Sequence, residues 1–194
     1  MAIDKLKFYK GLREQGFVGK LSQNQVNSID YILNYWDQKG YKDLRWLAYM
    51  FATIHHETAA TYLPIEEYGK GKGRPYGKKL KRSGVAYINP NKIYYGRGYV
   101  QLTWFENYEL MGRLIGEDLL NNPELMLLVP EATKVMFEGM TKGASSFGDF
   151  TGKCLEIYFN DKVEDPINVR RIINGKDKAK LIAGYYEKFK LILG

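Results

Sequence analysis

The stretch that decides the fold is Asp43-Leu-Arg-Trp-Leu-Ala-Tyr-Met-Phe-Ala-Thr-Ile-His-His-Glu57. Asp43 suits the N-cap of a helix, because its carboxylate can accept hydrogen bonds from the first backbone N–H groups. The apolar residues that follow recur at helical spacing: Leu44, Leu47, Phe51 and Ile54. Glu57 comes three residues after Ile54 and extends the same stripe. A carboxyl group is therefore expected on the inward side of this helix.

Helical spacing also appears before and after this stretch. Ser22 and Gln25 have the spacing of a capping box, which predicts a helix to about Lys39. The pattern returns in residues 108–115 and 130–140. These segments indicate a mainly α-helical protein.

Two more helices are predicted near the C-terminus. One should begin at Asp165-Pro166 and end at Gly175, and Asp177 should cap the last helix. In the middle of the chain, residues 69–98 are too rich in glycine and turn-forming residues to be helical. That stretch predicts loops and a small hairpin.

The length of 194 residues suits one domain. We expect a single catalytic domain over residues 1–194, with no separate cell-wall-binding module. No apolar run reaches the roughly 18 residues of a bilayer span, and the N-terminus shows no signal peptide, so a soluble protein is expected. Cys154 is the only cysteine and is expected to be buried rather than reactive.

A net charge of +7 favours a polyanionic partner. The basic residues concentrate in a glycine-rich stretch, at Lys70, Lys72, Arg74, Lys78, Lys79, Lys81 and Arg82. This stretch reads as a mobile basic loop. A loop that binds a polyanion and a loop that is simply solvated are both open interpretations.

Glu57 is a candidate general acid, because burial favours the neutral, protonated form of a carboxyl group. A glutamate on a helix is more often a solvated surface residue, but the apolar stripe argues against that here. Acid-assisted cleavage of a glycosidic bond needs a second carboxylate, and the nearest candidates are Glu66 and Glu67. Adjacent residues of an extended segment point in opposite directions, so at most one of the two is expected to face the substrate.

The run Tyr94-Tyr-Gly-Arg-Gly-Tyr-Val-Gln-Leu-Thr-Trp104 carries the aromatic, amide and hydroxyl groups that bind sugars. Its alternation from Tyr99 to Trp104 also fits an ordinary half-buried strand. Other chemistries are disfavoured. His56-Glu57 is no zinc-protease motif, because position 60 is Ala60, and no nucleotide-binding loop occurs. We expect no metal and no cofactor.

Three segments resemble glycoside hydrolase family 19, the chitinase-like branch of the lysozyme superfamily. They are His56-Glu57-Thr58, residues 95–104 and Asn107-Tyr108. The resemblance implies a two-lobed lysozyme-like fold with a small β-hairpin and loop region around residues 65–103. Small members of this kind look most like bacteriophage endolysins, which cut peptidoglycan.

The resemblance also implies roles for individual residues. Glu57 would be the general acid, and Glu67 the second carboxylate, with Glu66 as the alternative. Thr103 would position the attacking water. The substrate-binding positions would be His56, Tyr95, Arg97, Gln101, Asn107 and Asn174.

The expected function is that of an endolysin that hydrolyses the β-1,4 bonds of peptidoglycan with inversion. Its basic surface would attract the anionic bacterial envelope, and we expect a monomer without a nucleic-acid partner. Synthesis in the bacterial host cytoplasm and release to the cell wall by a holin follow from the resemblance. A chitinase and a noncatalytic polyanion-binding module are the alternatives.

Overall fold

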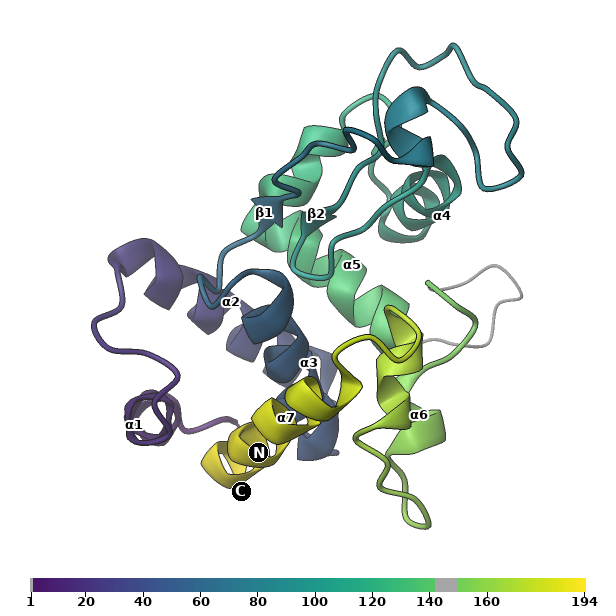
Figure 1. Cartoon of the computed structure of the whole chain (residues 1–194). Helices are drawn as coiled ribbons and strands as arrows, with labels where there is room; N and C mark the ends of the chain where they lie inside the picture. Colours follow the sequence, from purple (N-terminus) through teal and green to yellow (C-terminus); the bar gives the residue numbers. More distant parts are fainter. Residues whose placement is uncertain (1, 142–149) are drawn as a thin grey trace.

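The computed structural model describes residues 2–141 and 150–194, and its ribbon divides into two lobes (Figure 1). The lower lobe in this view holds helices from both ends of the chain, and the upper lobe holds the short strands and long loops of the middle third. The mainly helical, two-lobed prediction is confirmed. Within the described residues, no helix combines the length and apolar character that crossing a bilayer requires.

The first half of the chain supplies the helices α1 (Lys5–Glu14), α2 (Gln23–Lys39) and α3 (Leu44–Glu57). The capping box of α2 is confirmed, because the Gln25 N–H donates to Ser22 Oγ over 3.3 Å and the Ser22 N–H donates to Gln25 Oε1 over 2.9 Å. The predicted cap of α3 is also confirmed: Asp43 Oδ1 accepts from the Arg45 N–H over 3.0 Å.

Sequence patterning did not indicate α1. Its buried residues are Phe8 and Leu12, and most other positions are charged or polar. Because this apolar stripe is narrow, α1 is stabilised by packing against α7 (Ala179–Leu193). Gly11 permits that close approach, since a Cβ at this position would lie 2.8 Å from the Ile192 side chain.

The two C-terminal predictions need correction. The expected helix from Asp165 to Gly175 is only a 3₁₀ turn, η3 (Asn168–Ile172). Val169 and Ile172 are both fully buried, and residues three apart share a face in 3₁₀ geometry, so core packing favours the tighter turn. Asp177 does not cap α7. Lys178 occupies that position with a φ of 56° and gives no side-chain cap.

The upper lobe places short elements around a two-stranded sheet. They are β1 (Ile65–Glu66), η1 (Pro75–Lys78), β2 (Arg97–Gly98), α4 (Phe105–Ile115) and η2 (Pro123–Leu127). The strands pair antiparallel, with Ile65 opposite Gly98 and Glu66 opposite Arg97, which confirms the predicted hairpin region. From this lobe α5 (Val129–Thr141) runs down toward the lower lobe (Figure 1).

The interpretation of residues 99–104 as a half-buried strand is wrong. After β2 the chain turns back, and the Leu102 N–H donates to the Arg97 carbonyl oxygen over 2.8 Å. Positive φ angles at Gly98 (83°) and Gln101 (53°) produce this reversal. The segment is therefore a tight turn that begins the wall beside α4.

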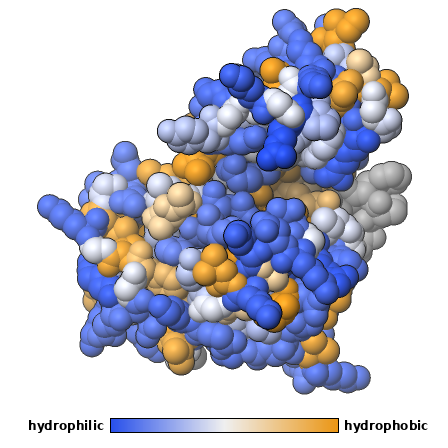
Figure 2. Space-filling model, viewed as in Figure 1, coloured by the Kyte–Doolittle hydropathy of each residue, from blue (hydrophilic) through white to orange (hydrophobic). Residues whose placement is uncertain are grey.

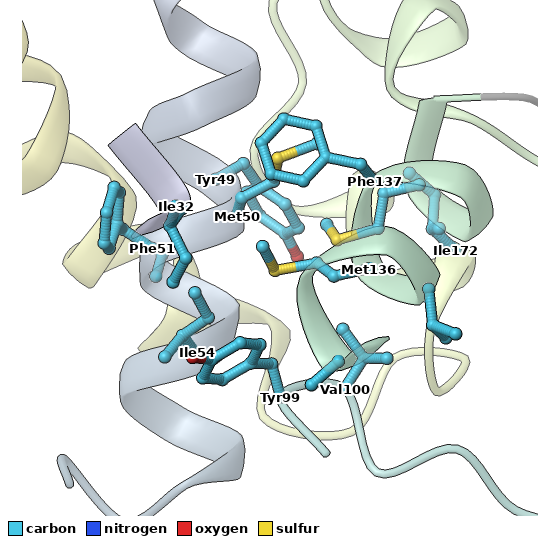
Figure 3. Close-up of a cluster of buried hydrophobic side chains, with 14 of the residues drawn as sticks. Ile32, Tyr49, Met50, Phe51, Ile54, Tyr99, Val100, Met136, Phe137 and Ile172 are labelled. Carbon is cyan, nitrogen blue, oxygen red and sulfur yellow. The ribbon is translucent and has the colours of Figure 1, made fainter. Parts of the chain in front are cut away.

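One hydrophobic core connects the lobes (Figure 3). Met50 and Ile54 of α3 meet Met136 and Phe137 of α5, and Tyr99 joins them from the turn after β2. All five side chains are at most 2% exposed.

The face in Figure 2 is mostly hydrophilic, with small separate apolar patches. A short helix, α6 (Leu155–Tyr158), completes the lower lobe, and Cys154 before it is buried as predicted.

Candidate active site

A cleft of about 600 Å³ lies at the C-terminal end of α3. Its lining comes from segments far apart in sequence: Glu57, Arg74 to Tyr76, Arg82, Val100 to Trp104, Asn107, Phe150-Thr151 and Ile173-Asn174. Of the predicted site residues, the cleft brings together Glu57, Gln101, Thr103, Asn107 and Asn174. Glu66, Glu67, His56, Tyr95 and Arg97 are not among its lining residues.

Glu57 is the last residue of α3, and its side chain is 15% exposed. The chain turns sharply after it, with positive φ at Ala59 (50°) and Ala60 (62°), and the Ala60 N–H donates to the His55 carbonyl oxygen over 2.8 Å. This turn ends the helix at the edge of the cleft. The apolar stripe therefore carries the carboxyl group as far as the cleft.

The nearest charged neighbour of Glu57 is a residue that sequence reasoning missed. Arg170 Nη2 lies 2.6 Å from Glu57 Oε1, and the arginine side chain is only 1% exposed. The contact lacks hydrogen-bond geometry, since Glu57 Oε1 has no hydrogen-bond partner within the described residues, and Arg170 Nη1 has none there either. The Arg170 Nε–H donates to the Asp177 carbonyl oxygen over 3.0 Å.

A buried guanidinium needs a counter-ion, because an unpaired buried charge is strongly destabilising. Glu57 fills that role. The sequence does contain an indication that Arg170 is buried, since it lies between the apolar residues Val169 and Ile172. This pattern does not predict which acidic residue pairs with it.

The two candidates for the second carboxylate have different surroundings. Glu66 accepts a hydrogen bond from the Tyr95 hydroxyl over 2.8 Å and pairs with Lys70 Nζ over 2.6 Å. Hydrogen bonds from Lys70 and then from Tyr95 hold the pKa of Glu66 below its ordinary value. Glu66 is thus an ionised group with 35% of its side chain exposed.

Glu67 is bound more completely into the upper lobe. Its Oε1 accepts from the Tyr76 hydroxyl over 3.1 Å, and its Oε2 accepts from the Gly96 N–H over 3.1 Å. Both carboxylate oxygens of Glu67 therefore hold parts of the upper lobe together. Glu66 also has both oxygens engaged, but one of its partners is the 61%-exposed Lys70 side chain, which is easier to displace than the backbone N–H of Gly96 that Glu67 binds.

The turn after β2 carries the polar wall of the cleft. The Thr103 hydroxyl donates to the Gln101 carbonyl oxygen over 2.8 Å, and Asn107 Nδ2 donates to the Thr103 carbonyl oxygen over 2.8 Å. Gln101 Nε2 donates to the carbonyl oxygens of Ile65 and Gly98, each over 3.1 Å. These bonds use the amide nitrogens and leave the amide oxygens of Gln101 and Asn107 for a ligand.

Backbone strain accompanies this wall. Gln101 has a φ of 53° and Trp104 a φ of 81°. Side-chain-bearing residues adopt such angles at a cost of about 1 to 3 kcal/mol each, and strained positions concentrate at functional sites. Thr103 and Trp104, which lie at or between these positions, are both lining residues of the cleft.

Tyr95 and Arg97 lie behind the wall rather than in the cleft. They are 8% and 6% exposed, and the guanidinium of Arg97 stacks 3.5 Å from the centre of the Tyr95 ring. Arg97 Nη1 donates to the Ile93 carbonyl oxygen over 3.1 Å and to the Tyr108 hydroxyl over 3.0 Å. The structure therefore shows these two residues supporting the site from inside the upper lobe.

The two histidines precede Glu57 on α3 and are both partly buried. Burial lowers the pKa of His55 to about 4, and also lowers the pKa of His56 below its ordinary value. His55 Nδ1 lies 2.8 Å from the Tyr62 hydroxyl, inside the lower lobe. Across the described ranges, no group of three or more His, Cys, Asp or Glu side chains is placed to hold a metal ion.

The sequence profile of the class I chitinases, glycoside hydrolase family 19, matches residues 38–141. This match covers more than half of the chain. The protein belongs to glycoside hydrolase family 19. The matched segment contains Glu57, both candidate second carboxylates and the polar turn, whereas Arg170 and Asn174 lie beyond it.

Known family members are similar to parts of this chain. Basic endochitinase B of Arabidopsis thaliana is 66% identical over 88 residues, which are 41% of this chain and 26% of that protein. Inactive chitinase-like protein 1 of Hevea brasiliensis is 57% identical over 90 residues, which are 42% and 28% of the two chains. The matched segments thus span less than a third of these relatives' length.

The fold of the family extends over the whole chain. A solved bacterial family 19 chitinase superposes with a TM-score of 0.58 at 21% identity, and the match covers 100% of this chain and 96% of that one. The expected lysozyme-like architecture is confirmed by this similarity. These similarities establish the family. They do not test whether the protein is of the bacteriophage endolysin type, which stays a prediction.

Proposed function

We propose that this protein hydrolyses β-1,4 glycosidic bonds in polymers that contain N-acetylglucosamine, with Glu57 as the general acid. The observation that carries the proposal is a shielded carboxyl group at the edge of a polar cleft, beside Thr103 and Asn107. Membership of family 19 supports the same reaction. The endochitinase relatives make chitin-type oligomers the first substrate to test.

In the proposed reaction, Glu57 protonates the leaving oxygen while a water molecule attacks the anomeric carbon. Glu66 is the proposed base: its carboxylate is ionised, and the exposed Lys70 side chain can move away to free an oxygen for the proton, with Glu66 acting from beside the lining residues of the cleft. Thr103 donates its hydroxyl proton to the Gln101 carbonyl oxygen, so its own oxygen can accept a hydrogen bond from that water. Arg170, 2.6 Å from Glu57, would stabilise the carboxylate that remains after proton transfer.

Peptidoglycan is the second candidate substrate. It contains N-acetylglucosamine in the same type of β-1,4 linkage, and it also carries carboxylates. Arg74 and Arg82 line the cleft and favour a carboxylate-bearing glycan. A lytic role in a bacterial host depends on this second candidate.

The test is the Glu57→Gln variant, which keeps the size of the side chain but removes the transferable proton. Release of reducing ends from chitin oligomers and from peptidoglycan should fall about a hundredfold to ten-thousandfold. The variant should still bind the glycan. Its unfolding midpoint must be measured alongside, because the substitution would leave Arg170 without a counter-ion.

An alternative of another class is a noncatalytic glycan- or polyanion-binding module. The Hevea relative, named as inactive, shows that similarity over this segment can occur without activity. Wild-type protein that releases no reducing ends from either polymer would support this alternative. Equal turnover by wild type and a folded Glu57→Gln variant would instead remove Glu57 from the mechanism.

A further inference from the structure

The cleft carries more positive charge on its upper-lobe side than hydrolysis of a neutral sugar requires. Arg74 and Arg82 both belong to its lining, together with Trp104 and Tyr76. Among the described lining residues Glu57 is the one acidic side chain, and its carboxyl group already contacts Arg170 over 2.6 Å. Neither Arg74 nor Arg82 forms an ion pair with an acidic side chain in the part of the chain that the structure describes.

The loop that carries these arginines is braced by its own packing. Gly71 and Gly77 meet so closely that a Cβ on Gly77 would lie 1.9 Å from the Gly71 carbonyl oxygen. Between them, the 3₁₀ turn η1 starts directly after Arg74. The Tyr76 hydroxyl donates to Glu67 Oε1 over 3.1 Å, and this fixes the turn to the upper lobe. Arg74 therefore extends from an anchored segment.

Arg82 is held near Trp104, an aromatic residue of the same wall. Its backbone N–H donates to Glu106 Oε1 over 2.9 Å, and its guanidinium carbon lies 6.0 Å from the centre of the Trp104 ring. The Tyr76 ring meets Trp104 edge-on, with 5.4 Å between ring centres. One wall of the cleft thus combines an apolar ring with two cations.

This combination has a defined chemical preference. An indole ring packs against the apolar face of a pyranose, while a guanidinium forms paired hydrogen bonds with a carboxylate. A cleft lined by one sign of charge also concentrates oppositely charged ligands. Neutral N-acetylglucosamine polymers use only the first of these properties.

We propose that Arg74 and Arg82 form a carboxylate-binding subsite, which makes the cleft selective for N-acetylhexosamine glycans that carry carboxylates over neutral ones. The inference rests on the proposed function and specifies its substrate class. In peptidoglycan strands stripped of their stem peptides the carboxylate is the lactyl group of the muramic acid. In intact strands that group is amide-bonded, and the carboxylates are those of the stem peptide. Both present the same chemistry to the two arginines.

The test compares wild type with an Arg74→Gln/Arg82→Gln double variant. Three substrates are used: chitin hexamer, glycan strands stripped of their stem peptides, and intact uncrosslinked peptidoglycan strands. The ratio of kcat/KM for the carboxylated substrate to that for chitin hexamer should fall about threefold to tenfold, the scale expected for two exposed ion pairs. The effect should appear mainly in KM and should shrink at high salt.

The matched control is Lys72→Gln/Lys78→Gln. This double variant removes the same charge from the same loop, at positions that do not line the cleft. It should leave the ratio unchanged. An equal fall in both double variants would show general attraction to a basic surface and would overturn the subsite.

A binding measurement separates this inference from the proposed reaction. Titration of the Glu57→Gln variant with stripped strands and with intact strands, with and without the two arginine substitutions, measures affinity without turnover. If the substitutions change the affinity for neither kind of strand, the subsite is overturned, whether or not wild type is active. If stripped strands bind weakly and intact strands bind tightly through the arginines, the stem peptide supplies the recognised carboxylate.

Discussion

At the residue scale, Glu57 and Arg170 show what a sequence can and cannot predict. The position of Glu57 followed from helical periodicity, because a stripe of apolar residues determines which side of a helix faces inward. Its ion pair with Arg170 could not be predicted, because the two residues are distant in sequence and meet only through the fold. Likewise, the sequence could not distinguish the roles of Glu66 and Glu67, because they differ only in the hydrogen-bond partners that the fold gives them.

The two glutamates of the hairpin give a direct prediction. Glu66→Gln removes the proposed base and should lower kcat on chitin oligomers about a hundredfold or more. Glu67→Gln keeps an oxygen that can accept from Tyr76 or Gly96, so its loss should stay below about tenfold. Reducing-end assays on both variants, with circular dichroism as the folding control, measure the difference. The reverse order of effects would make Glu67 the base and Glu66 a partner of Lys70.

At the scale of elements, sequence spacing predicted the caps of α2 and α3 but not the start of the last helix. Ser22 and Asp43 start their helices through side-chain hydrogen bonds that sequence spacing indicates. The last helix starts instead at Lys178, where the backbone turns through positive φ without a side-chain cap. The turn after β2 was missed for a similar reason, since positive φ at Gln101 and Trp104 is imposed by surrounding structure rather than by residue type.

The helix α4, which carries Asn107, offers a test of close packing. A Cβ on Gly112 would lie 2.6 Å from the Glu117 carbonyl oxygen and 3.2 Å from the Leu119 nitrogen. These are backbone atoms, so the clash cannot be relieved by a side-chain rotation. Gly112→Ala should therefore lower the free energy of unfolding by about 1 to 3 kcal/mol, measured by urea denaturation.

The control for this substitution is Gly184→Ala in α7, where a Cβ would meet no atom within 4 Å. Because alanine favours the helix by about 0.5 to 1 kcal/mol over glycine, this variant should be slightly more stable than wild type. Wild-type stability in Gly112→Ala would mean that the connection after α4 moves to accept the methyl group.

At the scale of the whole molecule, the sequence predicted a helical, two-lobed protein and five of the residues that line its cleft. The family resemblance predicted the two-lobed architecture, and the periodicity of apolar residues predicted the larger helices. The positions of Tyr95 and Arg97 differed from expectation because the reversal after β2 turns them into the upper lobe. Which residues line a cleft depends on how the lobes pack, and local patterns contain little of that information.

The same packing predicts how the stability of the molecule depends on pH. His55 lies among Phe17, Tyr185 and Phe189 of the lower lobe, and burial lowers its pKa from 6.5 to about 4. In the unfolded chain, this histidine takes up a proton as the pH falls below about 6.5. The folded protein does not, so protons favour unfolding between the two pKa values. Stability is present above the unfolded pKa and is lost as the pH falls toward the folded one.

A shift of this size should lower the free energy of unfolding by about 2 kcal/mol between about pH 7.5 and about pH 5. His55→Gln can keep a hydrogen bond to the Tyr62 hydroxyl but cannot titrate, so its stability should change less over this interval. Urea denaturation of both proteins at the two pH values measures the difference. His56→Gln is the neighbouring control, because the pKa of His56 is also lowered and its own share must be subtracted. Equal pH dependence in wild type and His55→Gln would show that the buried ring does not control acid stability, whatever the absolute cost of losing its aromatic contacts.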